Sequence, residues 1–297
     1  MILVVGEILF DVFEKEKQLG GAPFNFAYHL KNFGFPVRYI SRIGNDTHGK
    51  EILNILEHHH FSIDDIQIDD KYDTGTVIVQ LSSSGNPTFH INTDVAYDYI
   101  NYLPKEHSTL IDMADFIYFG TLVQRSKQGF ENIQRFMENR RPDTVCFYDI
   151  NLRPDCYSEK VILTSLEHAD ILKLNTQELD ECKRIFRFSK NNDAFIHFLM
   201  DQYALKIVAI TRGDKGSELY TKDGHFQAKI NRVSSIVDTV GAGDAYSSML
   251  AVGIIKGWEP ARILSIASMF ASRICEIRGA IPEYQESYEL IKEMIEN

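Results

Sequence analysis

The chain has 297 residues, of which 44% are hydrophobic and 25% are charged, as is usual for a globular protein with a sizeable core. Its formal net charge of -11 argues against nucleic acid and anionic membrane surfaces as partners, because both attract basic proteins. The longest apolar stretch, 245–255, is too short to span a bilayer, and the apolar start of the chain is too short for a signal peptide. We expect a cytoplasmic protein whose four cysteines are reduced, namely Cys146, Cys156, Cys182 and Cys275.

Strands and helices alternate in the first hundred residues, except for one segment whose pattern predicts strands only. Apolar runs predict strands at 3–5 and 37–43, and periodic apolar positions predict helices at 23–33 and 50–58. The segments 74–82 and 88–91 are rich in β-branched and alternating residues and flank a turn at 83–87, which predicts a hairpin. We interpret this hairpin as an insertion that covers a site, and we expect residues 12–18 to join it.

The alternation is cleaner in the rest of the chain. It predicts strands at 116–119, 145–148, 171–174 and 206–211, a hairpin of 217–220 with 226–230, and helices at 126–139, 176–186, 192–203, 242–256, 260–277 and 282–295. Strands joined through helices form a mainly parallel sheet covered on both faces. We therefore expect one α/β domain over 1–297, with a small β lid inserted from about 12–18 and 74–100.

A glycine-rich turn near the end of the chain carries the strongest chemical signal. Gly241, Ala242 and Gly243 precede Asp244 where a helix is predicted to begin. Backbone N–H groups that converge at a helix N-terminus bind phosphate or a developing anion, and a neighbouring carboxylate can take a proton from a hydroxyl. A plain helix start is the structural alternative. A dinucleotide fingerprint fails because its last glycine position is occupied by Tyr246.

Two motifs near the start indicate where an acceptor would bind. Gly20 and Gly21 precede a predicted helix that contains Asn25, whose amide can both donate to and accept from a hydroxyl. Asp11 lies just past the first strand, where α/β sheets bind their ligands. An ordinary loop-to-helix junction and a solvated loop acid are the alternatives.

Three further motifs follow predicted strands. Asn175 and Glu178 have the spacing of a helix-capping box, and Glu178 could also hold Mg²⁺ through water. Arg153 could neutralise a phosphate or form a surface salt bridge. The segment 211–216 contains Thr211, Gly213 and Gly216 and is either a nucleotide-lining turn or a plain tight turn.

Together, these motifs resemble the signatures of the ribokinase-like, PfkB-type carbohydrate kinases. Their order and spacing match that family over nearly the whole chain. The resemblance implies a three-layer α/β/α sandwich with a β lid, and transfer of the γ-phosphate of ATP, with Mg²⁺, to a sugar hydroxyl. It makes Asp244 the general base and the amides of Gly241, Ala242 and Gly243 the anion hole.

The same resemblance assigns the remaining site residues. It places Asp11, Gly20, Gly21, Asn25 and Arg153 at the sugar, and Asn175, Thr211, Gly213 and Gly216 at the nucleotide. It adds Asp238 beside a K⁺ ion that many relatives require, and it allows a homodimer formed through the lids.

Fructokinase is the version of the family that the chain resembles most. Gly6 and Glu7 before Asp11 are fructokinase-like, and so is the series Asp149, Asn151 and Arg153. We therefore expect conversion of D-fructose to fructose 6-phosphate. A kinase of the same fold that acts on a nucleoside, an aminoimidazole riboside or another sugar is the nearest alternative. A non-catalytic sugar-binding protein is a further one.

Overall fold

A nine-stranded sheet forms the centre of the computed structural model, which describes residues 1–81, 87–229, 236–282 and 286–296. Its strand order is β13-β12-β11-β10-β9-β8-β1-β4-β5. The strands from β11 to β5 in this order are parallel to one another, whereas β12 and β13 form an antiparallel hairpin at one edge. The strands are β1 (Ile2–Val5), β4 (Val37–Gly44), β5 (Ile66–Asp69), β8 (Phe116–Gly120), β9 (Val145–Asp149), β10 (Ile171–Asn175), β11 (Ile207–Thr211), β12 (Ser217–Thr221) and β13 (Gly224–Ala228).

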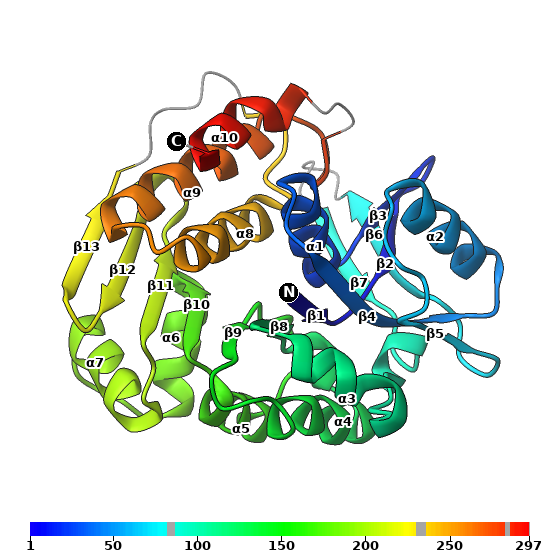
Figure 1. Cartoon of the computed structure of the whole chain (residues 1–297), viewed down its shortest axis with the longest axis horizontal. Helices are drawn as coiled ribbons and strands as arrows, with labels where there is room; N and C mark the ends of the chain where they lie inside the picture. Colours follow the sequence, from blue (N-terminus) through cyan, green and yellow to red (C-terminus); the bar gives the residue numbers. More distant parts are fainter. Residues whose placement is uncertain (82–86, 230–235, 283–285, 297) are drawn as a thin grey trace.

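Helices cover both faces of this sheet, as the sequence predicts (Figure 1). One face packs against α1 (Ala22–Asn32), α2 (Thr47–His58), α8 (Ala242–Ile255), α9 (Pro260–Ile274) and α10 (Glu286–Glu296). The other face packs against α3 (Pro104–Met113), α4 (Lys127–Glu138), α5 (Glu159–His168), α6 (Thr176–Ile185) and α7 (Asn192–Tyr203).

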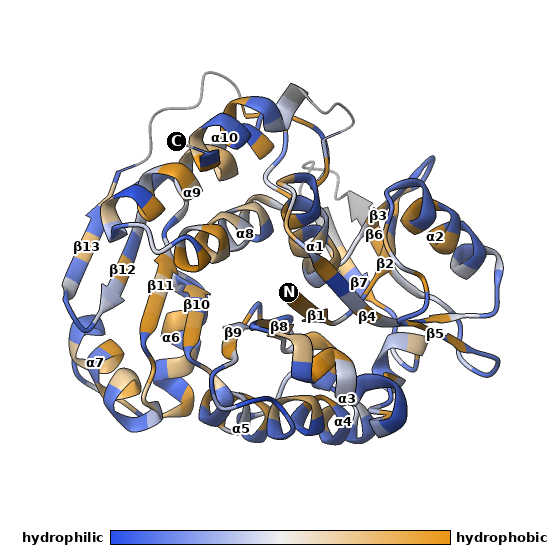
Figure 2. Cartoon of the chain, viewed as in Figure 1, coloured by the Kyte–Doolittle hydropathy of each residue, from blue (hydrophilic) through white to orange (hydrophobic). Residues whose placement is uncertain are grey.

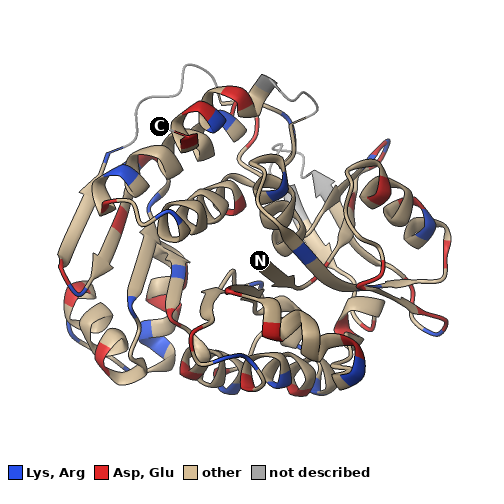
Figure 3. Ribbon diagram, viewed as in Figure 1, with Lys and Arg blue, Asp and Glu red and all other residues tan. Residues whose placement is uncertain are grey.

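The burial of alternate residues on opposite faces explains the apolar runs in the sequence. On β1, Val4 packs into the helix layer that contains α1 and α8, while Leu3 and Val5 pack into the layer formed by α3 to α7. Strands of this kind have no solvated face, so their residues are apolar on both sides. Figure 2 shows apolar colouring along the central strands and mixed colouring on the helices, and Figure 3 shows most charged residues on the outer helices and loops.

A second sheet of four strands lies beside the large one, as expected for the β insertion. Its order is β3-β2-β6-β7, formed by β2 (Leu9–Val12), β3 (Lys17–Gly20), β6 (Gly75–Leu81) and β7 (Pro87–Ile91). The insertion is shorter than the predicted 74–100. Residues 96–99 form a buried 3-10 helix instead, because Ala96 and Tyr97 pack into the core.

A buried ion pair fixes the point where the second sheet rejoins the body. Arg125 donates to both carboxylate oxygens of Asp98 at 2.6 and 2.8 Å, and also to the backbone carbonyl of Asn92 at 2.6 Å. Arg125 and Asp98 are 8% and 3% exposed. The strand β7 is thus tied to the core one residue after its end.

Several element boundaries differ from the sequence predictions. The helix predicted at 50–58 begins at Thr47, because Asp46 caps it by accepting from the Gly49 amide. The helix predicted at 260–277 ends at Ile274. The strand β5 and the helices α3 and α5 were not predicted. The turn at 83–86, Ile230 and the first residues of the helix predicted at 282–295 lie outside the described residues.

Candidate active site

No side chain caps the N-terminus of α8 in the described structure. The N-cap residue Gly241 has a left-handed backbone with φ of 75°. A β-carbon there would lie 2.2 Å from the Ala280 side chain, so only glycine fits. The turn therefore offers the amides of Gly241 and Gly243 and the positive end of a helix dipole, whereas the Ala242 amide makes a long hydrogen bond of 3.4 Å to the Thr239 carbonyl. Its role as an anion hole stays a prediction.

Asp244 occupies the first turn of α8 and is that helix's one charged residue. One of its carboxylate oxygens accepts a hydrogen bond of 2.7 Å from the side-chain amide of Asn25, which lies on α1. The two motifs, 219 residues apart in the sequence, thus meet directly. Burial raises the pKa of Asp244 to about 6, against the lowering effects of Asn25, Lys173 and Arg153. A carboxylate with this pKa is ionised at neutral pH and accepts a proton more readily than an ordinary aspartate.

Three predicted sugar contacts lie in the second sheet or directly after it, namely Asp11, Gly20 and Gly21. Burial raises the pKa of Asp11, on β2, to about 6. Gly20 lies on the neighbouring strand β3, where it is paired with Leu9, and a β-carbon on Gly20 would lie 2.8 Å from a carboxylate oxygen of Asp11. Gly21 has φ of 108° and approaches the backbone carbonyl of Glu7 so closely that a β-carbon would lie 2.5 Å away. The two glycines therefore leave room for Asp11 and allow α1 to pack close to β1.

Arg153 lies in the loop after β9 and has an exposed side chain. Its positive charge lowers the pKa values of Glu7, Asp11 and Asp244, which places it near all three carboxylates. The described part of the chain shows no salt bridge to its guanidinium, so the surface ion pair considered from the sequence is absent from that part. Arg153 remains a cation at the mouth of the site.

The predicted nucleotide contacts lie at the ends of β10 and β11. Asn175 and Thr211 are partners in the register of these two strands. The turn after β11 contains Gly213 with φ of 55° and Gly216 with φ of 92°. A β-carbon on Gly216 would lie 2.0 Å from the carbonyl oxygen of Ala228. The turn therefore depends on glycine. It follows the carboxyl end of β11, and the N-terminus of α8 lies at the same end of the parallel strands.

Asn175 and Glu178 form the capping box that the sequence predicts. The Asn175 side chain accepts from the Glu178 amide at 2.9 Å, and Glu178 accepts from the Asn175 amide at 2.7 Å. The second oxygen of Glu178 accepts from the Leu152 amide at 3.0 Å. Burial raises the pKa of Glu178, against the effect of Lys173. Each carboxylate oxygen keeps a lone pair that could accept from a water bound to Mg²⁺.

Asp238 holds two loops together beside the anion hole. Its oxygens accept from the amides of Val240 and Gly279, both at 3.1 Å. Gly279 contacts Gln18 of β3, and the adjacent Arg278 pairs with Glu16, so these loops also touch the second sheet. Among the described residues, no group of three or more His, Cys, Asp or Glu side chains is placed to hold a metal ion.

Two buried charged residues of this region were assigned no role in the site from the sequence. Glu7 is 3% exposed, and one of its carboxylate oxygens has no hydrogen-bond partner in the described structure. Burial raises its pKa to about 7. Lys173, in the apolar strand β10, is 5% exposed and pairs with Asp149 on β9 at 3.1 Å. A lysine inside an otherwise apolar strand requires a buried partner, and this is the feature of the sequence from which Lys173 could have been found.

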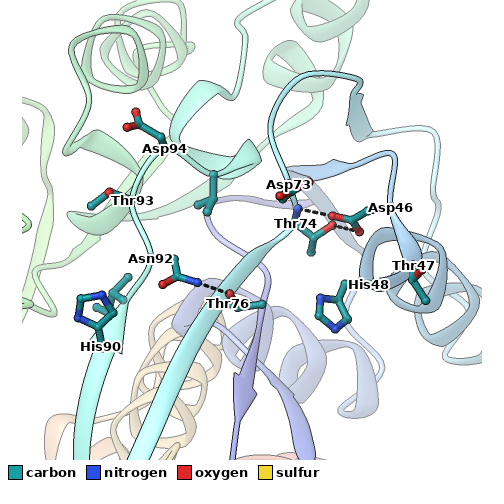
Figure 4. A pocket seen from close by; sticks show the side chains of 12 residues that line it. Asp46, Thr47, His48, Asp73, Thr74, Thr76, His90, Asn92, Thr93 and Asp94 are labelled. Carbon is teal, nitrogen blue, oxygen red and sulfur yellow. Dashed lines mark hydrogen bonds between the residues drawn. The ribbon is translucent and has the colours of Figure 1, made fainter.

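A cavity of about 660 Å³ opens on the other side of the second sheet (Figure 4). It is bordered by Asp46 and His48 at the start of α2 and by Thr76 of β6. Thr76 is paired with Phe10, whereas Asp11 is paired with the next residue of β6. Since successive strand residues face opposite sides, this cavity is on the face away from Asp11 and is separate from the candidate active site.

Comparison with known proteins assigns the family. The description "pfkB family carbohydrate kinase" matches residues 3–286. The chain belongs to this family. A sugar kinase from Pyrococcus horikoshii is 27% identical over 98% of this chain and 97% of its own length. Its crystal structure in complex with ATP has a TM-score of 0.79 at 26% identity and covers 98% of this chain and 100% of that chain.

Two other relatives differ in their names. 5-Dehydro-2-deoxygluconokinase 1 of Bacillus cereus is 25% identical over 86% of this chain and 79% of its own length. The structure of fructokinase with bound ATP from Xylella fastidiosa has a TM-score of 0.86 at 21% identity, covering 99% of this chain and 98% of that chain. This likeness shows the fold. The pfkB family and the ribokinase-like α/β fold predicted from the motifs are thus confirmed. No helix in the described part of the chain is long and apolar enough to cross a membrane.

Proposed function

We propose that this carbohydrate kinase transfers the γ-phosphate of ATP to a hydroxyl of D-fructose, giving fructose 6-phosphate. The observation that carries the proposal is the 2.7 Å hydrogen bond between Asn25 and Asp244 at the uncapped N-terminus of α8. It brings a candidate base, a hydroxyl-binding amide and an anion site together. Phosphoryl transfer to an alcohol needs these three groups at one point.

In the proposed reaction, the hydroxyl oxygen of the sugar attacks the γ-phosphorus of ATP, and Asp244 accepts the proton of that hydroxyl. The bond between that phosphorus and the bridging oxygen of ATP breaks, and ADP leaves. The amides of Gly241, Ala242 and Gly243 stabilise the charge on the phosphoryl group. The turn containing Thr211, Gly213 and Gly216 binds the nucleotide together with Asn175.

The surrounding residues complete the proposed site in one domain over 1–297. The second sheet is the lid, and Asp11, Gly20, Gly21 and Arg153 are on its acceptor side. Glu178 would hold Mg²⁺ through water, and the ion would neutralise charge on the phosphates. Asp238 would border a K⁺ ion, if this kinase uses one, since its loop joins the anion hole to the loop containing Gly279.

A second candidate acceptor is an acidic sugar such as 5-dehydro-2-deoxygluconate. Arg153 supports it, because this exposed cation faces the site without a salt bridge among the described residues. The name of the Bacillus cereus relative points the same way. A carboxylate on the acceptor would pair with Arg153, whereas fructose offers it hydroxyl groups only.

A substrate panel with coupled detection of ADP tests the proposal. The panel contains fructose, 5-dehydro-2-deoxygluconate, ribose, inosine and aminoimidazole riboside, and Asp244→Asn is the control for contaminating kinases. Fructose should give the highest kcat/KM. A preference for the acidic sugar that disappears in Arg153→Met would select the second candidate. Absence of ADP formation with every acceptor would contradict the kinase assignment of the site.

A further inference from the structure

Lys173 and Asp149 form a buried ion pair directly behind the anion hole. The two residues are partners in the register of β10 and β9, and the Lys173 ammonium donates to Asp149 at 3.1 Å. Their side chains are 7% and 0% exposed. A buried pair of this kind costs desolvation energy and seldom improves stability over a packed apolar pair. Stability alone therefore does not explain the presence of this ion pair in the sheet. Its position behind the anion hole suggests a role in the proposed reaction.

The hydrogen bonds of Asp149 leave the lysine facing the first turn of α8. The second oxygen of Asp149 accepts from Tyr118 at 3.1 Å and from Ser247 at 2.7 Å. The Ser247 hydroxyl oxygen also lies 3.0 Å from the carbonyl oxygen of Gly243, which is the alternative acceptor for its single proton. A β-carbon on Gly243 would lie 3.4 Å from the Lys173 ammonium nitrogen, which is an ordinary contact distance and places the charge beside the turn. The positive member of the pair is thus next to the anion hole.

We propose that Lys173 is a positioning residue for phosphoryl transfer, whose ammonium, held by Asp149, keeps Asp244 ionised and adds positive charge behind the Gly241–Gly243 turn. This inference rests on the proposed kinase function and adds a residue to its site. Burial opposes the charge on Lys173, but Asp149, Glu178 and Asp244 outweigh burial and raise its pKa. The ammonium therefore stays charged at neutral pH.

The charge of Lys173 affects the pKa of Asp244 together with charged groups on the neighbouring elements. Burial raises the pKa of Asp244, and the negative charge of Asp149 adds to this, while Lys173 opposes it. Removing Lys173 alone would leave Asp149 uncompensated and raise the pKa of Asp244 further. The charged and titratable groups that face Asp244 are Glu7 after β1, Tyr118 on β8, Asp149 on β9, Arg153 after β9 and Lys173 on β10.

The experiment compares Lys173→Gln with the double variant Lys173→Gln/Asp149→Asn. The single variant should lose at least about tenfold in kcat with little change in either KM, and its acidic limb of kcat/KM should move up by about one pH unit. The double variant contains no unpaired buried charge, so its melting temperature and its acidic limb should return toward wild type. Its kcat should stay low, because the positive charge is still missing.

Ser248→Ala is the matched control, because Ser248 neighbours Ser247 on α8, is equally buried and bonds only to the carbonyl of Ala245 among the described residues. It should keep wild-type kcat. Recovery of both stability and kcat in the double variant would overturn the proposal, since the pair would then be structural only. A raised KM for ATP at unchanged kcat would also overturn it.

An activity-free measurement separates this inference from the kinase assignment. The carboxyl ¹³C resonance of Asp244, assigned by its loss in Asp244→Asn, should titrate at higher pH in Lys173→Gln than in wild type. An unchanged titration would overturn the inference even if the enzyme is active. A shifted titration in a protein without kinase activity would support the electrostatic link while the proposed function fails.

Discussion

Replacing Asp244 by asparagine should stabilise the protein and remove most of its activity, and the structure gives a magnitude for the first effect. Burial raises the pKa of Asp244 from 3.8 to about 6. The folded state thus binds this proton more tightly than the unfolded state, so ionisation lowers stability as the pH rises from about 4 to about 6. The difference corresponds to about 3 kcal/mol above that range. Asparagine has no charge to bury and can still accept from Asn25.

Unfolding by heat and by urea at pH 8 and pH 5 measures this gain. At pH 8 the melting temperature of Asp244→Asn should exceed that of wild type by several degrees. At pH 5 the gain should be about half as large, because most folded wild-type molecules are already protonated at Asp244. The control Asp180→Asn changes an exposed carboxylate on α6 and should alter stability by less than about 0.5 kcal/mol.

The same variant tests the proposed chemistry. Loss of a general base should reduce kcat by a factor of about 10² to 10⁴. Because the variant is expected to be more stable, unfolding cannot explain such a loss. Near-normal turnover would remove Asp244 as the base. A variant that is no more stable than wild type at pH 8, or a gain that is equal at both pH values, would refute the electrostatic reasoning.

Three further predictions concern the pH profile, the nucleotide turn and the junction of the second sheet. With saturating ATP, kcat/KM for the sugar should fall below about pH 6 as Asp244 and Asp11 become protonated, and a flat profile down to pH 5 would contradict this. Gly216→Ala should lower the melting temperature and raise the KM for ATP more than an alanine at Gly213, whose β-carbon would meet no atom within 4 Å. Arg125→Met should cost about 3–5 kcal/mol in urea unfolding, because it leaves Asp98 buried without its partner, and addition of Asp98→Asn should recover part of this; no recovery would show that the charge of Asp98 is not the cause.

Much of the large sheet could be predicted because its strands are buried on both faces. Val4, Phe119 and Ile210 belong to runs that have no polar alternation, and such runs stand out in a sequence. The missed elements lack that signal. The strand β5 has four residues at the edge of the sheet, and the first turn of α5 carries the polar Glu159 and Lys160 after its cap Ser158. A strand of four residues is too short to show a clear period, and the polar first turn of α5 leaves few positions from which a helical period can be read.

The candidate site was predictable where glycines or capping residues mark a turn, and less so where burial alone decides. Gly20, Gly21 and Gly241 are at positions that no side chain would fit, so a local pattern reports them. Lys173 has no such pattern around it, and although Glu7 follows Gly6, where a β-carbon would clash with Pro23, that glycine does not report the burial of Glu7. Their importance comes from neighbours that are distant in sequence, since Lys173 meets Asp149 and α8 only after the sheet has formed. A single sequence does not contain those distances.

The N-termini of α6 and α8 show that the same local sequence pattern can serve two different roles. Both α6 and α8 have an acidic residue in the first turn, Glu178 and Asp244. In α6 the carboxylate folds back onto the amide of Asn175 and closes the helix end. In α8 the N-cap is Gly241, which has no side chain, and Asn25 of another helix takes the carboxylate instead. The N-terminus of α8 consequently has no side-chain cap, which is why we propose that its acidic residue acts as a base beside an anion hole rather than as a cap.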